Sequence, residues 1–133
     1  MKPETARFAD QANSMLARAT IRIGAGLPED AARTSYLANF HMAQALIYEA
    51  TGRVLKTHRG VQTEFARLTR DDPAIDKELR KILSRSYDFK AFADYFSGPV
   101  ASISAEQAAE AVATARRFLA HLAGTLTGTI EGH

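Results

Sequence analysis

The chain has 133 residues, of which 46% are hydrophobic and 24% are charged, and its formal net charge at pH 7 is +2. This length suits one domain with a single core, and the composition excludes a disordered chain. Cysteine is absent, which excludes disulfides, thiolate nucleophiles and cysteine-bound zinc or iron–sulfur sites, and fits a reducing compartment.

The first predicted helix covers about residues 4–23, where apolar side chains recur at spacings of three and four. Gly24 and Gly26 end it, because glycine tolerates the left-handed backbone found after a helix. The second predicted helix opens at Pro28 and stops near Gly52. Its apolar face is broad, which indicates a central helix that packs on several sides.

The third predicted helix runs to about residue 69, with Thr57 as its N-cap. Asp72 and Pro73 are expected to begin the fourth helix, the aspartate as the cap and the proline at the first helical position. Glycine and proline at positions 98–99 end it. The second half of this helix is strongly aromatic: Tyr87, Phe89, Phe92, Tyr95 and Phe96.

The fifth predicted helix begins at a capping-box pair, Ser104 and Gln107, and its apolar stripe continues to Leu122. No alternating strand pattern of useful length appears. We therefore expect an all-α fold, an up-and-down antiparallel bundle of four to five helices. Residues 1–123 form one domain in this prediction, and residues 124–133 form a flexible C-terminal tail.

Basic residues cluster between positions 53 and 70, where Glu64 is the only acid. Twelve of the seventeen basic residues in the chain are arginine, whose planar guanidinium suits two-point contact with phosphate. A local phosphate-binding patch and an ordinary solvated helix face are both open interpretations. The cluster consists of Arg53, Lys56, Arg59, Arg67 and Arg70.

Four short motifs follow one another along the chain. They are Tyr36, Ala38, Phe40 and His41; Thr57, His58 and Gly60; Asp94 and Tyr95; and Ala115, Phe118 and Leu119. In order and spacing they resemble the HEPN domains, small helical bundles of prokaryotic nuclease and nucleotide-binding systems. The resemblance runs from the first helix to Leu122, and it implies an all-α bundle that commonly forms homodimers.

The resemblance also implies a catalytic pattern. Many HEPN domains are ribonucleases with an arginine, four to six residues, and then a histidine, usually composed across a homodimer and without a metal or other cofactor. A neutral imidazole can take the proton of the ribose 2′-hydroxyl while a guanidinium stabilises the charged phosphorane. Similar chains often carry arginine four residues before the Asp-Tyr pair, where this chain has Lys90, and no histidine follows Arg85 at the required spacing. The expected catalytic site is therefore degraded or absent.

Two pairs elsewhere match the spacing literally: Arg53 with His58, and Arg116 with His121. Residues five apart on a continuous helix point about 140° away from each other, which is a poor geometry for joint action. The first pair spans a turn, so this objection is weaker for it. His58 also has a structural interpretation, since an imidazole near a helix start can bond exposed backbone or a neighbouring helix end.

Several other polar residues are binding candidates. Lys56 lies in the basic cluster, while Lys90, Asp94 and Tyr95 lie together in the fourth helix, where Asp94 and Tyr95 can line a pocket or pack at the helix end. His41 is interpreted as a histidine of the core or of a dimer interface. The histidine spacings predict no metal site.

Two functions remain from different classes. The first is a HEPN binding module that partners a nucleotidyltransferase in a toxin–antitoxin-type pair, or that binds RNA or nucleotides. The second is a metal-independent ribonuclease toxin with His58 as general base and Arg53 or Arg59 as the cation. The N-terminus lacks a signal-peptide core, and no window of about twenty apolar residues occurs. We therefore expect a cytoplasmic homodimer without membrane insertion.

Overall fold

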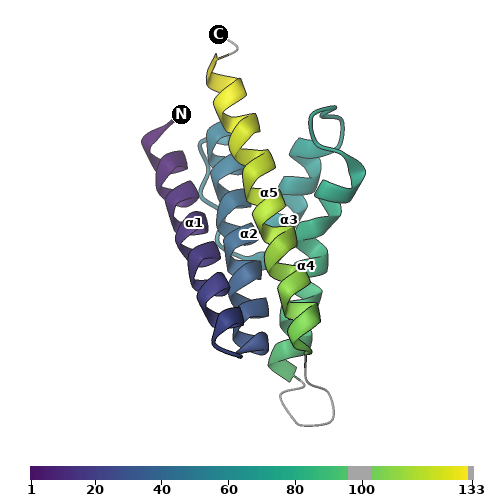
Figure 1. The fold of residues 1–133 in the computed structure, drawn as a ribbon. Helices are drawn as coiled ribbons and strands as arrows, with labels where there is room; N and C mark the ends of the chain where they lie inside the picture. The colour runs from purple at the N-terminus through teal and green to yellow at the C-terminus, as the bar shows by residue number, and fades with distance from the viewer. Residues whose placement is uncertain (96–102, 132–133) are drawn as a thin grey trace.

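The computed structural model describes residues 1–95 and 103–131 of the chain. Five helices make up the fold, α1 (Pro3–Gly24), α2 (Pro28–Thr51), α3 (His58–Thr69), α4 (Lys77–Tyr95) and α5 (Ala105–Glu131). They pack as a bundle, with the shorter α3 beside α4 (Figure 1). No strand occurs in the described ranges, so the all-α bundle is confirmed. None of the described helices is long and apolar enough to cross a membrane.

The α2 helix is the centre of the bundle, because it contacts each of the other four helices. Most of its side chains from Ala31 to Ile47 are buried, and small alanines alternate with large groups such as Tyr36 and Met42. Small residues let neighbouring helices approach closely, while the large ones fill the space between them. The broad apolar face read from the sequence therefore corresponds to a helix that is packed on several sides.

The start of α3 depends on two residues of the Thr-His-x-Gly motif. The Thr57 side-chain oxygen accepts a hydrogen bond from the backbone N–H of Gly60 at 3.0 Å, which confirms Thr57 as the N-cap. A Cβ atom at position 60 would lie 2.7 Å from that oxygen, which is closer than real contacts allow. Glycine at this position therefore keeps the cap in place, and His58 becomes the first residue of the helix.

The predicted start of α4 at Asp72 and Pro73 is wrong. These residues form a separate turn, in which the Asp72 carbonyl accepts a hydrogen bond from the Ile75 N–H at 3.1 Å. The turn buries Ile75, and the helix begins only after it, at Lys77. Asp76 is the residue that caps α4, since its carboxylate accepts the Leu79 N–H at 2.8 Å. Burial of one isoleucine therefore delays the helix by one turn.

The start of α5 is as predicted. The Ser104 N–H donates to the Gln107 side chain at 2.9 Å, and the Gln107 N–H donates to the Ser104 hydroxyl at 3.0 Å, which forms a reciprocal capping box. The helix continues past Leu122 to Glu131, and Leu126 is still buried. Residues 124–131 thus extend α5, while the flexibility that we expected for residues 124–133 stays a prediction.

Candidate functional site

The side chain of His58 sits among aromatic rings from α2 and α4. Its Nδ1 atom lies 2.7 Å from the hydroxyl of Tyr36, which is fully buried. The ring centroid of His58 lies 5.4 Å from that of Tyr36, 5.2 Å from that of Phe40 and 5.0 Å from that of Tyr87. We call these four residues together with Lys90 the His58 cluster.

Local structure explains why these rings meet. Tyr36 and Phe40 are one turn apart on α2 and therefore share a face of that helix. The Thr57 cap fixes the first turn of α3, and so it fixes the direction in which His58 leaves the backbone. Tyr87 completes the cluster from α4, with its ring centroid 5.4 Å from that of Tyr36. The site is thus held by three consecutive helices, α2, α3 and α4.

Burial lowers the pKa of His58 below its ordinary value, and the nearby positive charge of Lys90 lowers it further. The imidazole is therefore neutral at pH 7. Burial also raises the pKa of Tyr36, although the Gln62 side chain works against this, so the phenol keeps its proton. A neutral imidazole and a protonated phenol can share their hydrogen bond in two ways, because either Tyr36 or Nδ1 can be the donor.

The direction of that hydrogen bond decides what Nε2 of His58 can do. If Tyr36 donates to Nδ1, Nε2 carries the proton and can only donate to a ligand. If Nδ1 donates to the phenol oxygen, Nε2 has a lone pair and can act as a base. No hydrogen bond of Nε2 occurs within the described part of the chain. The same geometry therefore serves anion binding in one tautomer and proton abstraction in the other.

A second polar group joins α2 to α4 beside this cluster. The Asp94 carboxylate accepts hydrogen bonds from Lys90 at 2.7 Å and from Arg33 at 2.6 Å, and Arg33 also contacts Asp30. The bond from Lys90 holds the pKa of Asp94 below its usual range, with a further contribution from Arg33, although burial opposes both. Burial likewise opposes the charge on Arg33, but the bonds to Asp94 and Asp30 outweigh it and raise the pKa of its guanidinium.

Tyr36 and Phe40 of the α2 motif thus meet His58 of the α3 motif, and Lys90 links this cluster to Asp94 of the α4 motif. The family model of the HEPN domain matches residues 5–124, which is most of this chain. The chain belongs to the HEPN family. A comparison with curated proteins finds no significant match.

Within this HEPN domain, the structure brings together only some of the predicted site residues. His58 and Lys90 are neighbours, and Lys90 and Asp94 are bonded. Arg53 instead lies 3.6 Å from Glu64. Lys56 and Arg59 are exposed, and neither has a hydrogen bond or ion pair to the His58 cluster in the described ranges.

The remaining predicted residues lie elsewhere. The backbone of Tyr95 ends α4, but its side chain is outside the described residues. His41 is half-buried and bonded to the Gln44 side chain at 2.8 Å. Arg116 donates to Thr20 at 3.1 Å, whereas His121 contacts the backbone of Ala74, so this second literal match is not assembled.

Sequence reasoning missed two residues of the site, Arg33 and Tyr87. Arg33 was hidden because its partner Asp94 lies 61 positions away, and a salt bridge between helices leaves no periodic signal. Tyr87 was counted among the apolar aromatics of α4. A signal did exist for it, since Tyr87, Lys90 and Asp94 recur at spacings of three and four and therefore share one face of a helix.

Proposed function

We propose that this HEPN domain acts by binding an RNA or nucleotide phosphate, and that it does not cleave RNA with His58 and Arg53 or Arg59. The observation that supports this proposal most is the ion pair of Arg53. Its guanidinium pairs with Glu64, and aromatic rings together with Lys90 surround His58 instead. An arginine whose charge is paired with Glu64 is not positioned to stabilise a phosphorane beside the imidazole.

The exposed face of α3 supplies the binding surface in this proposal. Arg59 and Arg67 of α3, together with Arg70 at its C-cap, fall within an arc of about 80° around the helix axis, opposite the buried Val61 and Phe65. Glu64 contacts Arg67 and Arg53, and it is the only acid between positions 53 and 70. The surplus of positive charge suits contact with a phosphate backbone, where each arginine or lysine displaces counterions.

Binding of single-stranded RNA, measured by fluorescence anisotropy over a range of salt concentrations, tests the proposal. Arg59→Glu should weaken binding and reduce the slope of log affinity against log salt by about 0.7 for each phosphate that the variant no longer binds. Arg18→Glu makes the same charge change on the exposed surface of α1 and should leave the slope unchanged. Equal reductions in the two variants would show that α3 has no special part in binding.

Ribonuclease activity is the second candidate, because Lys90 provides the observation that favours it. The ammonium lies close enough to lower the pKa of His58, and it stands where the family resemblance implies arginine. The chain should then cleave RNA in EDTA, and both His58→Ala and Lys90→Gln should abolish cleavage in a protein that remains folded by circular dichroism. Intact RNA after incubation with the wild-type chain would exclude this candidate.

We also propose a homodimer and a nucleotidyltransferase partner, as the family resemblance implies. Sedimentation equilibrium of the purified chain tests the dimer, and a mass that remains monomeric at micromolar concentration would contradict it. For the partner, a small nucleotidyltransferase encoded next to this chain should co-purify with it. Separate elution of the two proteins would argue for nucleic acid as the sole partner.

A further inference from the structure

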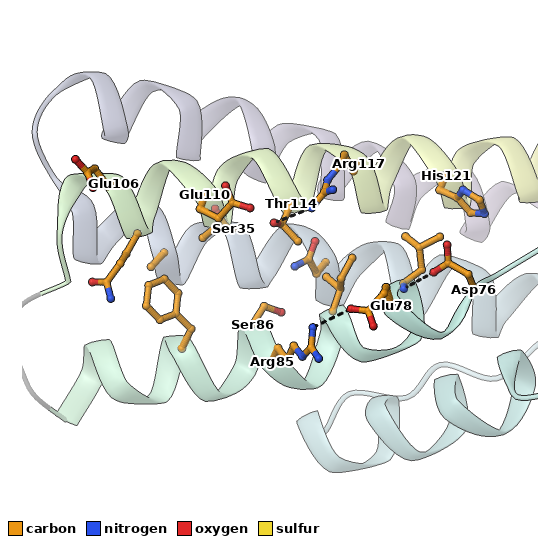
Figure 2. A pocket seen from close by; sticks show the side chains of 17 residues that line it. Ser35, Asp76, Glu78, Arg85, Ser86, Glu106, Glu110, Thr114, Arg117 and His121 are labelled. Atoms are coloured by element: carbon orange, nitrogen blue, oxygen red, sulfur yellow. Dashed lines mark hydrogen bonds and ion pairs between the residues drawn. The ribbon is translucent and has the colours of Figure 1, made fainter.

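A cleft of about 960 Å³ lies between α4 and α5, with residues of α2 at its base (Figure 2). Among the described residues that line it, none belongs to the His58 cluster and none lies on α3. A volume of this size falls in the range of small-molecule sites, about 300–1,000 Å³. The cleft is therefore a separate place at which the domain can bind a ligand.

The base of the cleft contains a buried polar side chain that lacks a partner. Asn39 lines the cleft and is only 1% exposed, yet its side-chain oxygen has no hydrogen bond within the described part of the chain. Nearby buried polar groups of α2 are satisfied, since Ser35 donates to the Ala31 carbonyl and Gln44 donates to the Leu55 carbonyl, both at 2.8 Å. Buried amides are almost always hydrogen-bonded in native proteins, so the unpaired oxygen of Asn39 needs a specific explanation.

The charge of the lining is opposite to that of the whole chain. Of the residues that the structure describes, four carboxylates and two guanidiniums line the cleft, although the chain carries a net charge of +2. Glu78 pairs with Arg85 at 3.2 Å, and Asp76 caps α4. Of the two remaining basic side chains, Arg117 donates to Thr114 at 3.3 Å, and His121 contacts the Ala74 backbone.

Two carboxylates are left without a partner. Glu106 and Glu110 are one turn apart on α5, and neither has an ion pair or hydrogen bond among the residues that the structure describes. Figure 2 shows both on the stretch of α5 that precedes Thr114, away from the Arg85–Glu78 pair. Like charges at this spacing repel each other, and a bound cation removes that repulsion. Leu79, Ile82 and Phe89 of α4 provide an apolar wall for the rest of a ligand.

We propose that this cleft binds a small organic amine with an apolar body. The ammonium group lies between Glu106 and Glu110, the apolar body packs against the α4 wall, and Asn39 bonds a polar group of the ligand. Rotation of the Asn39 amide about χ2 exchanges its oxygen and nitrogen, so this side chain can accept or donate. The acidic cleft and the basic face of α3 thus serve ligands of opposite charge.

Nuclear magnetic resonance titration of the full chain with phenylethylamine tests the proposal, with phenylethanol as the uncharged analogue. The amine should give saturable shifts in α4 and α5 near the cleft, and the alcohol should bind more weakly. The double variant Glu106→Gln/Glu110→Gln should raise the dissociation constant by at least about tenfold. Asp10→Asn/Asp88→Asn removes the same charge from exposed positions outside the cleft and should bind like the wild type.

Three results would overturn the proposal. They are the absence of saturable shifts, equal affinity for the alcohol and the amine, and equally weakened binding in the two double variants. Resonance changes at the cleft that follow protein dilution, with no response to the amine, would also overturn it, since a second copy of the chain would then occupy the cleft.

Asn39→Leu provides an independent test, because it replaces the amide with an apolar group of similar size. The variant should melt at a higher temperature than the wild type, as expected for a residue that serves a ligand at the expense of stability. It should also bind the amine tyramine more weakly, because the phenol of tyramine offers Asn39 a polar group, whereas phenylethylamine has no polar group besides its ammonium and should bind as before. A lower melting temperature with unchanged tyramine affinity would assign Asn39 to the fold and remove it from the site.

Discussion

The hydrogen bond between Tyr36 and His58 is partly buried, and each partner depends on the other. Tyr36 has no exposed surface, so its hydroxyl needs a partner inside the protein. His58 is half-buried, and aromatic rings lie against it on several sides. The bond therefore contributes to stability as well as setting the tautomer on which the chemistry of Nε2 depends.

Tyr36→Phe should lower the free energy of unfolding by about 1–2 kcal/mol, because it removes the hydroxyl and leaves Nδ1 of His58 without that partner. Urea denaturation measures this change. In a double-mutant cycle with His58→Gln, the two effects should differ from additivity by about 0.5 kcal/mol or more. Strict additivity would mean that the two side chains do not interact in solution.

The lowered pKa of His58 makes stability depend on pH. The folded protein binds fewer protons at His58 than the unfolded chain does, so its stability is fully present above the ordinary pKa of 6.5 and falls as the pH drops through that value. Urea denaturation between about pH 7.5 and about pH 5 should show a decrease in the wild type that is smaller in His58→Gln. A decrease of the same size in both proteins would mean that titratable groups other than His58 cause the pH dependence.

Lys90→Gln should raise the pKa of His58 toward its ordinary value, because it removes the neighbouring positive charge, while burial keeps part of the shift. The imidazole resonances of His58, followed by nuclear magnetic resonance across the same pH range, measure this. Lys77→Gln is the matched control at the exposed start of α4. If both variants shift the His58 titration equally, the effect belongs to net charge and not to Lys90.

At the scale of single elements, some helix starts could be predicted from the sequence and one could not. Thr57 and the pair Ser104 and Gln107 cap their helices as predicted, because a cap is a contact within three or four residues. The predicted start of α4 was wrong because the burial of Ile75 depends on tertiary packing, which the local sequence does not show. The same reasoning explains why the salt bridge of Arg33 with Asp94 was not predictable, whereas the buried stripe of α5 was.

Thr57→Ala should destabilise the protein by about 1 kcal/mol, because the Gly60 N–H loses its acceptor. Gly60→Ala should also destabilise it, although alanine is the better helix former, since the new methyl group displaces the capping oxygen. Thr63→Ala, at an exposed position of the same helix, should be neutral or stabilising. Thermal denaturation ranks the three variants, and a stabilising Gly60→Ala would refute this account of the cap.

At the scale of the whole molecule, one ring pair joins helices that are far apart in the sequence. Phe65 of α3 and Phe118 of α5 have centroids 5.6 Å apart, and both are buried. The third helix has only 12 residues, so it depends on such anchors. Because α3 carries His58 and the basic face, the anchor supports both the His58 cluster and the proposed binding surface.

Phe118→Ala should lower the free energy of unfolding by about 3–5 kcal/mol, since it leaves a cavity against Phe65. Ile21→Ala, at a side chain that is 70% exposed, should change it by no more than about 0.5 kcal/mol. Urea denaturation of the two variants tests the contrast. A small effect of Phe118→Ala would mean that the core closes around the missing ring.

The close approach of Gly60 to Thr57 bears on how such chains diverge. Threonine and glycine stabilise the start of α3, whatever His58 does, so selection for folding alone can preserve them after an activity has disappeared. The histidine between them is retained in part by its bond to Tyr36. A Thr-His-x-Gly motif in another sequence therefore indicates a capped helix start of this kind, and it does not by itself indicate a catalytic activity.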